Sequence, residues 1–95
     1  MTVLRHYTMT AAEGRADELR AALQRLADTV RALPQSLKVE LFADPDAPGT
    51  FVFVEHWATV GDHKQAGAML GKEAFAAVAA TLAGPPAGRY LTAIE

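Results

Sequence analysis

Residues 51–57 read FVFVEHW and form the most strongly patterned segment of this 95-residue chain. β-Branched and aromatic residues dominate the segment and no Gly or Pro interrupts it, so it is predicted to be a β-strand. Because side chains alternate along a strand, Glu55 and Trp57 should share one face, and Val54 and His56 the other. Both faces are largely apolar, which is typical of a central strand that is covered above and below. The only Trp ends this strand, two residues after a carboxylate on its own face, and we expect a functional site there.

The length and composition favour one small domain over residues 1–95. Apolar residues make up 51% of the chain, and a domain of this size buries a limited share of its surface, so part of the apolar surface is expected to be covered by a second copy of the chain. The net charge is -2 and the basic residues are scattered, which argues against nucleic acid and anionic membranes as partners. There is no Cys, no signal-peptide profile and no apolar run of membrane-spanning length, so a cytoplasmic protein is expected.

The remaining segments have equally readable periodicities. A helix is predicted over residues 15–33, where leucines and Val30 recur at spacings of four and three residues and Pro34 ends the pattern. Thr59 followed by Asp62 resembles a capping box and starts a second helix near Val60. This helix is expected to break or kink at Gly67 and Gly71, to resume at residue 72 and to end in residues 83–86. Strands are predicted at residues 2–8, 36–43, 51–57 and 89–94, with residues 44–49 as a hairpin loop.

The resulting order, βαββαβ, is that of a ferredoxin-like α+β fold, which has a four-stranded antiparallel sheet with two helices on one face. The other face of such a sheet is bare in a monomer. Here it would carry several apolar residues, and two sheets packed face to face would cover them. The sequence therefore predicts a homodimer in the form of a dimeric α+β barrel.

Three parts of the sequence resemble the antibiotic biosynthesis monooxygenase domain family: residues 44–57, Phe75, and residues 82–86. The resemblance extends over nearly the whole chain and rests on the order and spacing of these parts. It implies a dimeric α+β barrel with a pocket between sheet and helices in each subunit. It also implies oxidation of a small aromatic phenol or quinol by O₂ without a metal or an organic cofactor. The family often has a His nine or ten residues after the Trp, where this chain has Ala66 and Gly67, and the nearest histidine is His63.

An oxygenase without a cofactor needs a base that removes a phenolic proton, because the resulting anion can pass an electron to O₂. The candidate catalytic residues are His6, His63 and Glu55. Glu55 would have a raised pKa if it were buried, although it could instead be a structural carboxylate paired with Arg5 or Arg89. His63 could overhang a pocket from the first turn of its helix or lie in solvent. His6 could be a buried, hydrogen-bonded side chain, and His56, on the face opposite Trp57, is expected at an interface.

The candidate substrate-binding residues are large apolar or aromatic side chains, each of which could instead serve only in packing. They are Trp57, Tyr7, Phe53, Met69 and Phe75. The three histidines have no paired spacing, and we expect neither a metal nor a cofactor. Two other functions fit the same fold. One is a non-catalytic dimer that binds a ligand or serves in assembly, and the other is an isomerase or decarboxylase of a related dimeric barrel, which needs no oxygen.

Overall fold

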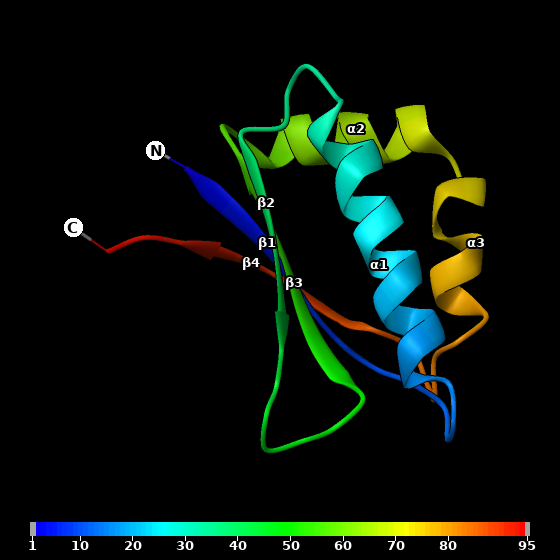
Figure 1. Cartoon of the computed structure of the whole chain (residues 1–95). Helices are drawn as coiled ribbons and strands as arrows, with labels where there is room; N and C mark the ends of the chain where they lie inside the picture. The colour runs from blue at the N-terminus through cyan, green and yellow to red at the C-terminus, as the bar shows by residue number, and fades with distance from the viewer. Residues whose placement is uncertain (1, 95) are drawn as a thin grey trace.

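The computed structural model of the protein describes residues 2–94 and has the ferredoxin-like α+β fold (Figure 1). Its elements, in chain order, are β1 (Val3–Thr10), α1 (Ala16–Arg31), β2 (Lys38–Ala43), β3 (Thr50–Trp57), α2 (Val60–Leu70), α3 (Glu73–Ala79) and β4 (Ala87–Thr92). The strand order is β2-β3-β1-β4, and all neighbouring strands are antiparallel. The helices lie on one side of the sheet, with α2 crossing at one end of it (Figure 1).

The first helix forms where the apolar spacing predicted it. The side chains of the stripe, Leu19, Leu23, Leu26 and Val30, are all buried against the sheet and α3. The helix ends at Arg31, two residues before the predicted end at residue 33, and Leu33 and Ser36 continue as turns around Pro34.

The second predicted helix consists of two helices. The hydroxyl of Thr59 accepts a hydrogen bond from the backbone N–H of Asp62 at 3.0 Å, so the predicted cap is confirmed. The helix continues through Gly67, where a break was also predicted, and it ends at Gly71, whose φ of 72° is in the left-handed region. The next helix ends at Ala79. The change of direction at Gly71 lets α2 and α3 cover different parts of the sheet (Figure 1).

The strands begin and end where pairing with a neighbouring strand begins and ends, and for this reason two strands have other bounds than predicted. β1 extends to Thr10 because Thr10 is paired with Thr50 of β3, and β4 begins at Ala87 because Ala87 is paired with Thr8. The first strand was predicted to end at residue 8 and the last to span residues 89–94, so both predictions were wrong by two residues at those ends. β2 begins at Lys38, not at residue 36, and the hairpin loop at residues 44–49 is confirmed.

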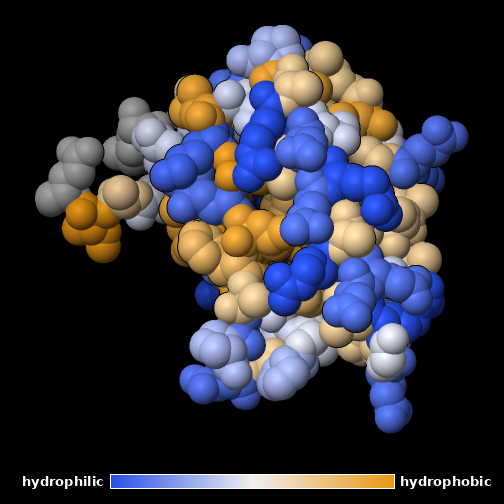
Figure 2. Space-filling model, in the orientation of Figure 1, coloured by the Kyte–Doolittle hydropathy of each residue, from blue (hydrophilic) through white to orange (hydrophobic). Residues whose placement is uncertain are grey.

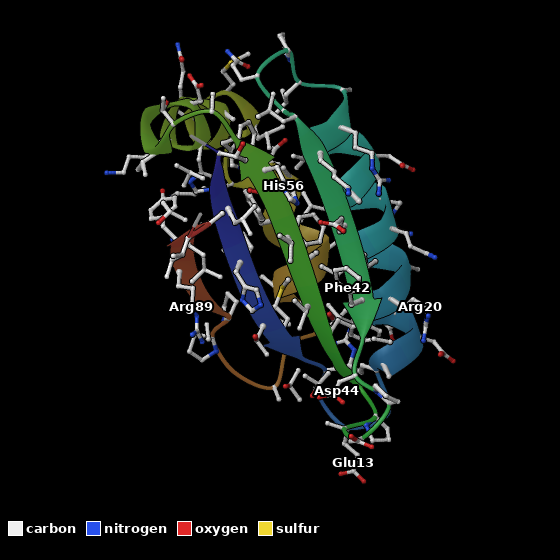
Figure 3. All side chains as sticks on the ribbon, turned by 90° about the vertical axis from the view of Figure 1, so that its left-hand side faces the viewer. Glu13, Arg20, Phe42, Asp44, His56 and Arg89 are labelled. Atoms are coloured by element: carbon white, nitrogen blue, oxygen red, sulfur yellow. The ribbon has the colours of Figure 1, made fainter. Side chains whose placement is uncertain are left out.

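The two faces of the sheet differ in what covers them. The core lies on the helix side, where Phe53 and Trp57 of β3 are almost completely buried. The opposite, outer face has no helix over it, and Figure 3 looks onto it: His56 lies on β3, Phe42 on β2 and Arg89 on β4. Figure 2 shows the molecule in the orientation of Figure 1, with polar residues over much of this side and an apolar patch between them. Among residues 2–94 no helix is long and apolar enough to cross a membrane.

Candidate functional site

A buried polar cluster lies on the helix side of the sheet, at the end of β3. Glu55 and Trp57 point to this side as predicted, and the two residues are 3% and 1% exposed. The indole Nε1–H of Trp57 donates a hydrogen bond to Oε1 of Glu55 at 3.1 Å. His63, in the first turn of α2, approaches the same carboxylate oxygen with its Nε2, at 3.6 Å. The carboxylate therefore has an indole and an imidazole as its polar neighbours.

Two tyrosines from neighbouring strands complete the surroundings of His63. The hydroxyl of Tyr7, on β1, is 3.2 Å from Nε2, and the hydroxyl of Tyr90, on β4, is 2.6 Å from Nδ1. The rings of Trp57 and Tyr90 both meet the imidazole edge-on. A neutral imidazole has one donor and one acceptor nitrogen, and a phenol can fill either role. Tyr7, His63 and Tyr90 therefore form a hydrogen-bonded chain along which a proton can move, with the carboxylate of Glu55 3.6 Å from the imidazole.

Burial sets the protonation states of this cluster. It raises the pKa of Glu55 to about 7, against the opposing effects of the Trp57 hydrogen bond and the positive charge of Arg5. Burial and the charge of Arg5 lower the pKa of His63, and burial raises the pKa of Tyr7. Near neutral pH the imidazole is therefore uncharged, while Glu55 is balanced between its acid and its carboxylate.

An apolar pocket of about 170 Å³ lies next to the cluster, between the sheet and helices α1 and α3. It is lined by Tyr7, Met9, Leu26, Phe53, Phe75, Val78, Ala79, Leu82 and Pro86. Tyr7 is the lining residue that also belongs to the polar cluster, because its hydroxyl contacts His63. A larger and more polar groove of about 520 Å³ lies elsewhere, between α1 and β2, with Arg20 and Arg31 at its sides.

The structure brings most of the predicted site residues together. Glu55, Trp57 and His63 form the polar cluster, and the alternative in which His63 lies in solvent was wrong, because its side chain is 17% exposed. Tyr7, Phe53 and Phe75 line the pocket.

Met69 and His6 lie elsewhere. Met69 is on α2 with 59% of its surface exposed and is not among the residues that line the pocket. His6 is paired with Val54 and Arg89 on the outer face, because the alternation of β1 turns it away from Tyr7. His56 is also on the outer face, where its Nε2 lies 2.6 Å from a carboxylate oxygen of Glu40.

Two residues of the site were not predicted as functional. Tyr90 contacts His63, and Arg5, considered only as an ion-pair partner of Glu55, lies over the rings of Tyr7 and Tyr90. The alternation along β1, which puts Arg5 and Tyr7 on one face, could be read from the sequence. The register that sets Tyr90 opposite Arg5 is seen only in the structure. Within residues 2–94 no three His, Asp or Glu side chains converge as a metal site would require.

A family model and several solved structures indicate the same family. Residues 2–80 match the family model for antibiotic biosynthesis monooxygenase, whereas none of the curated proteins matches the chain. A solved structure from Caulobacter crescentus, assigned to the antibiotic biosynthesis monooxygenases, is 28% identical, with a TM-score of 0.85 over 99% of this chain and 91% of that one. A second solved structure, from Bordetella bronchiseptica and also assigned to the antibiotic biosynthesis monooxygenases, is 18% identical. Its TM-score is 0.85 over 99% of this chain and 98% of that one. SnoaB, a cofactor-independent oxygenase from Streptomyces nogalater, is 16% identical, with a TM-score of 0.83 over 99% and 94%.

Proposed function

The chain belongs to the antibiotic biosynthesis monooxygenase family, and from this premise we propose that it is a cofactor-independent monooxygenase that oxidises a small aromatic phenol or quinol with O₂. One observation carries the proposal: a neutral, partly buried His63 lies in hydrogen-bond contact with a residue, Tyr7, that also lines an apolar pocket. The fold shared with SnoaB, a cofactor-independent oxygenase, supports the same chemistry.

The first step is removal of the phenolic proton. A substrate ring in the pocket would lie against Phe53 and Phe75, with its hydroxyl directed to the hydroxyl of Tyr7. The proton then passes through Tyr7 to Nε2 of His63, whose Nδ1–H donates to the hydroxyl of Tyr90. The imidazolium that results is stabilised by the carboxylate of Glu55, 3.6 Å away. This step requires a neutral His63 and an ionised Glu55 at the same time.

The oxidation begins with the phenolate anion of the substrate. The phenolate gives one electron to O₂, and the phenoxyl radical and superoxide combine at a ring carbon to form a peroxide after protonation. Loss of water from this peroxide breaks the O–O bond. For hydroquinone the balance is one quinol and one O₂ to one hydroxyquinone and one water, so one oxygen atom enters the ring and the other leaves as water. The apolar pocket walls shield the radical pair from solvent.

Oxygen uptake and isotope labelling test this function. Purified protein should consume O₂ with a panel of hydroquinones faster than boiled protein does, and O₂ labelled with heavy oxygen should leave one labelled atom in each product. Equal rates before and after boiling over the whole panel would contradict the proposal. Turnover that continues without O₂ would instead indicate an isomerase or decarboxylase.

A second candidate function is ligand binding without turnover. It is favoured by the pocket lining, in which Tyr7 is the only residue with a polar side-chain group. Native mass spectrometry of the protein as purified distinguishes the two functions. An aromatic ligand that stays bound and chemically unchanged in air would favour the binding function.

We also propose that residues 1–95 form a single domain that acts as a homodimer. Apolar side chains remain on the outer face of the sheet, where Phe42 and Leu91 are 49% and 39% exposed. A second sheet packed against this face would bury both side chains. His6 and His56 would then lie at or near the contact between the two subunits.

A further inference from the structure

Arg5 is a positively charged side chain that forms no ion pair with any of residues 2–94. Its guanidinium lies between two aromatic rings, 5.0 Å from the centre of the Tyr7 ring and 4.4 Å from that of Tyr90. Its Nε is buried and has no hydrogen-bond partner in the part of the chain that the structure describes. Arg5 is paired in register with Glu55, yet the ion pairs formed by residues 2–94 do not include Arg5.

A partly buried cation of this kind is incompletely satisfied. The π faces of the two tyrosines compensate for some of the lost hydration, and the contact with Arg5 favours the ionised form of Tyr7, but a neutral phenol supplies no negative charge to the guanidinium. Glu55 does not supply a fixed negative charge, because it is balanced between its acid and its carboxylate near neutral pH and forms no ion pair with Arg5. His63 and Tyr7 are uncharged there. A bound anion would provide what the free protein lacks, and a guanidinium fits an oxygen anion with two parallel hydrogen bonds.

Gly88 leaves room for this arrangement. A Cβ atom at residue 88 would lie 2.8 Å from Nη2 of Arg5 and 3.0 Å from Cε1 of Tyr7. The end of the Arg5 side chain therefore extends from β1 over β4, directly beside the ring of Tyr7. Tyr7 in turn lines the apolar pocket, so the positive charge lies next to the place where an aromatic ring would bind.

We propose that Arg5 binds an anionic oxygen of the aromatic substrate, and that the site therefore selects aromatic anions over neutral aromatics of the same shape. The inference rests on the proposed function for the location of the substrate, and it deepens that function by naming the substrate class. The anionic oxygen has two possible sources, a carboxylate attached to the ring or an ionised phenol. Both present the same chemistry to the guanidinium.

Ligand binding followed by the fluorescence of Trp57, the only Trp, tests the proposal. In the carboxylate arm, gentisate is compared with its neutral amide at about pH 6, where the phenol groups of both are protonated. In the phenolate arm, para-nitrophenol is compared below and above its own pKa with Glu55→Gln as the background, so that the titration of Glu55 near pH 7 does not change the charge beside Arg5. In at least one arm the anion should bind about tenfold more tightly than its neutral counterpart, and Arg5→Met should remove that preference. The arm that responds identifies the source of the anion.

Three further variants separate charge from structure. Arg20 also lies over an aromatic ring, that of Phe51 at 5.3 Å, but on another part of the molecule, so Arg20→Met is the matched control and should keep the preference. Arg5→Lys keeps the charge and should retain part of the preference. Gly88→Ala adds a methyl group that displaces the flexible end of Arg5 and should reduce the preference without unfolding the chain, which circular dichroism checks.

Equal binding of anionic and neutral ligands in both arms would overturn the proposal, and so would a preference that survives Arg5→Met in a folded variant. These outcomes are independent of the oxygenase function. Oxidation of neutral quinols without any preference for anions would leave the oxygenase standing and remove the role of Arg5. Selective binding of anions without O₂ uptake would support the role of Arg5 and contradict the oxygenase function.

Discussion

The indole of Trp57 donates its N–H to the carboxylate of Glu55 across 3.1 Å, and both side chains are buried on the same face of β3. A carboxylate in such a place would be expected to pair with a cation, yet its register partner Arg5 does not form an ion pair with it. The Trp57 hydrogen bond is therefore the main interaction that favours the ionised form of Glu55, against a burial that raises its pKa to about 7.

The first prediction concerns this hydrogen bond. Trp57→Phe removes the N–H donor while keeping an aromatic ring, so the pKa of Glu55 should rise further. If an ionised Glu55 stabilises the protonated His63, kcat/KM for a hydroquinone should increase with pH around 7 in the wild type, and the midpoint should move to higher pH in the variant. A pH–rate profile measured on both proteins checks this. An unchanged midpoint would mean that Glu55 does not control the rate.

The second prediction links Glu55 to stability. Its pKa rises from 4.5 in the unfolded chain to about 7 in the folded protein, so folding favours the protonated form. This contribution is fully present below about pH 4.5 and is lost as the pH rises through about 7, by about 3 kcal/mol in all. The amide in the Glu55→Gln variant cannot ionise, so the variant should not show this pH-dependent loss of stability.

Urea denaturation at several pH values tests the second prediction. The free energy of unfolding of the variant minus that of the wild type should increase between about pH 4 and about pH 8. Taking the difference subtracts the part of the opposite His63 contribution that does not depend on Glu55; the lowered pKa of His63 stabilises the fold at higher pH. A difference that does not change with pH would show that Glu55 titrates normally.

The sequence predicted the fold well because each element has one strong period. The helix stripe from Leu19 to Val30 and the alternation along residues 51–57 are local properties, and the hairpin loop is marked by its own residues. Alternation also put Glu55 and Trp57 on one face correctly. What failed were the ends of elements, such as Thr10 and Ala87, where pairing with another strand decides the boundary.

The site was only partly predictable because it joins distant parts of the chain. His63 belongs to it through the direction in which α2 leaves β3, and that direction is set by packing on the sheet. Tyr90 belongs to it through the register of β4 on β1, which shows no sign in the sequence of β4 alone. Met69, in contrast, was predicted to bind substrate, but the packing of its helix leaves it exposed.

The third prediction assigns the base. His63→Gln keeps a polar side chain of similar size but cannot take up the proton, so the rate of quinol oxidation should fall by about 100-fold or more. His56→Gln is the matched control: this histidine also contacts a carboxylate, that of Glu40, but on the outer face, and its loss should change the rate little. Oxygen uptake measured on both variants decides. Equal losses would point to an effect on folding or assembly.

The fourth prediction concerns the pocket. Ala79 lines it from the last position of α3 and is exposed, so a large side chain can be accommodated there without disturbing the core. Ala79→Phe should obstruct the pocket and raise KM for aromatic substrates by about tenfold, with little change in the melting temperature. Ala76→Phe, at an exposed position on the same helix that does not line the pocket, should leave KM unchanged. Similar KM values for the two variants would mean that substrates bind elsewhere.

The fifth prediction tests the proposed pairing of two sheets. Leu91 lies on the outer face opposite Leu4 of β1 and is 39% exposed, so Leu91→Asp would place a charge inside a dimer contact without entering the core of the subunit. Sedimentation equilibrium at micromolar concentration should give a dimer for the wild type and a folded monomer for this variant. Met69→Asp, which places the same charge on exposed α2, should remain dimeric. A wild type that sediments as a monomer would contradict the pairing, because the outer face would then stay open to water in the functional protein.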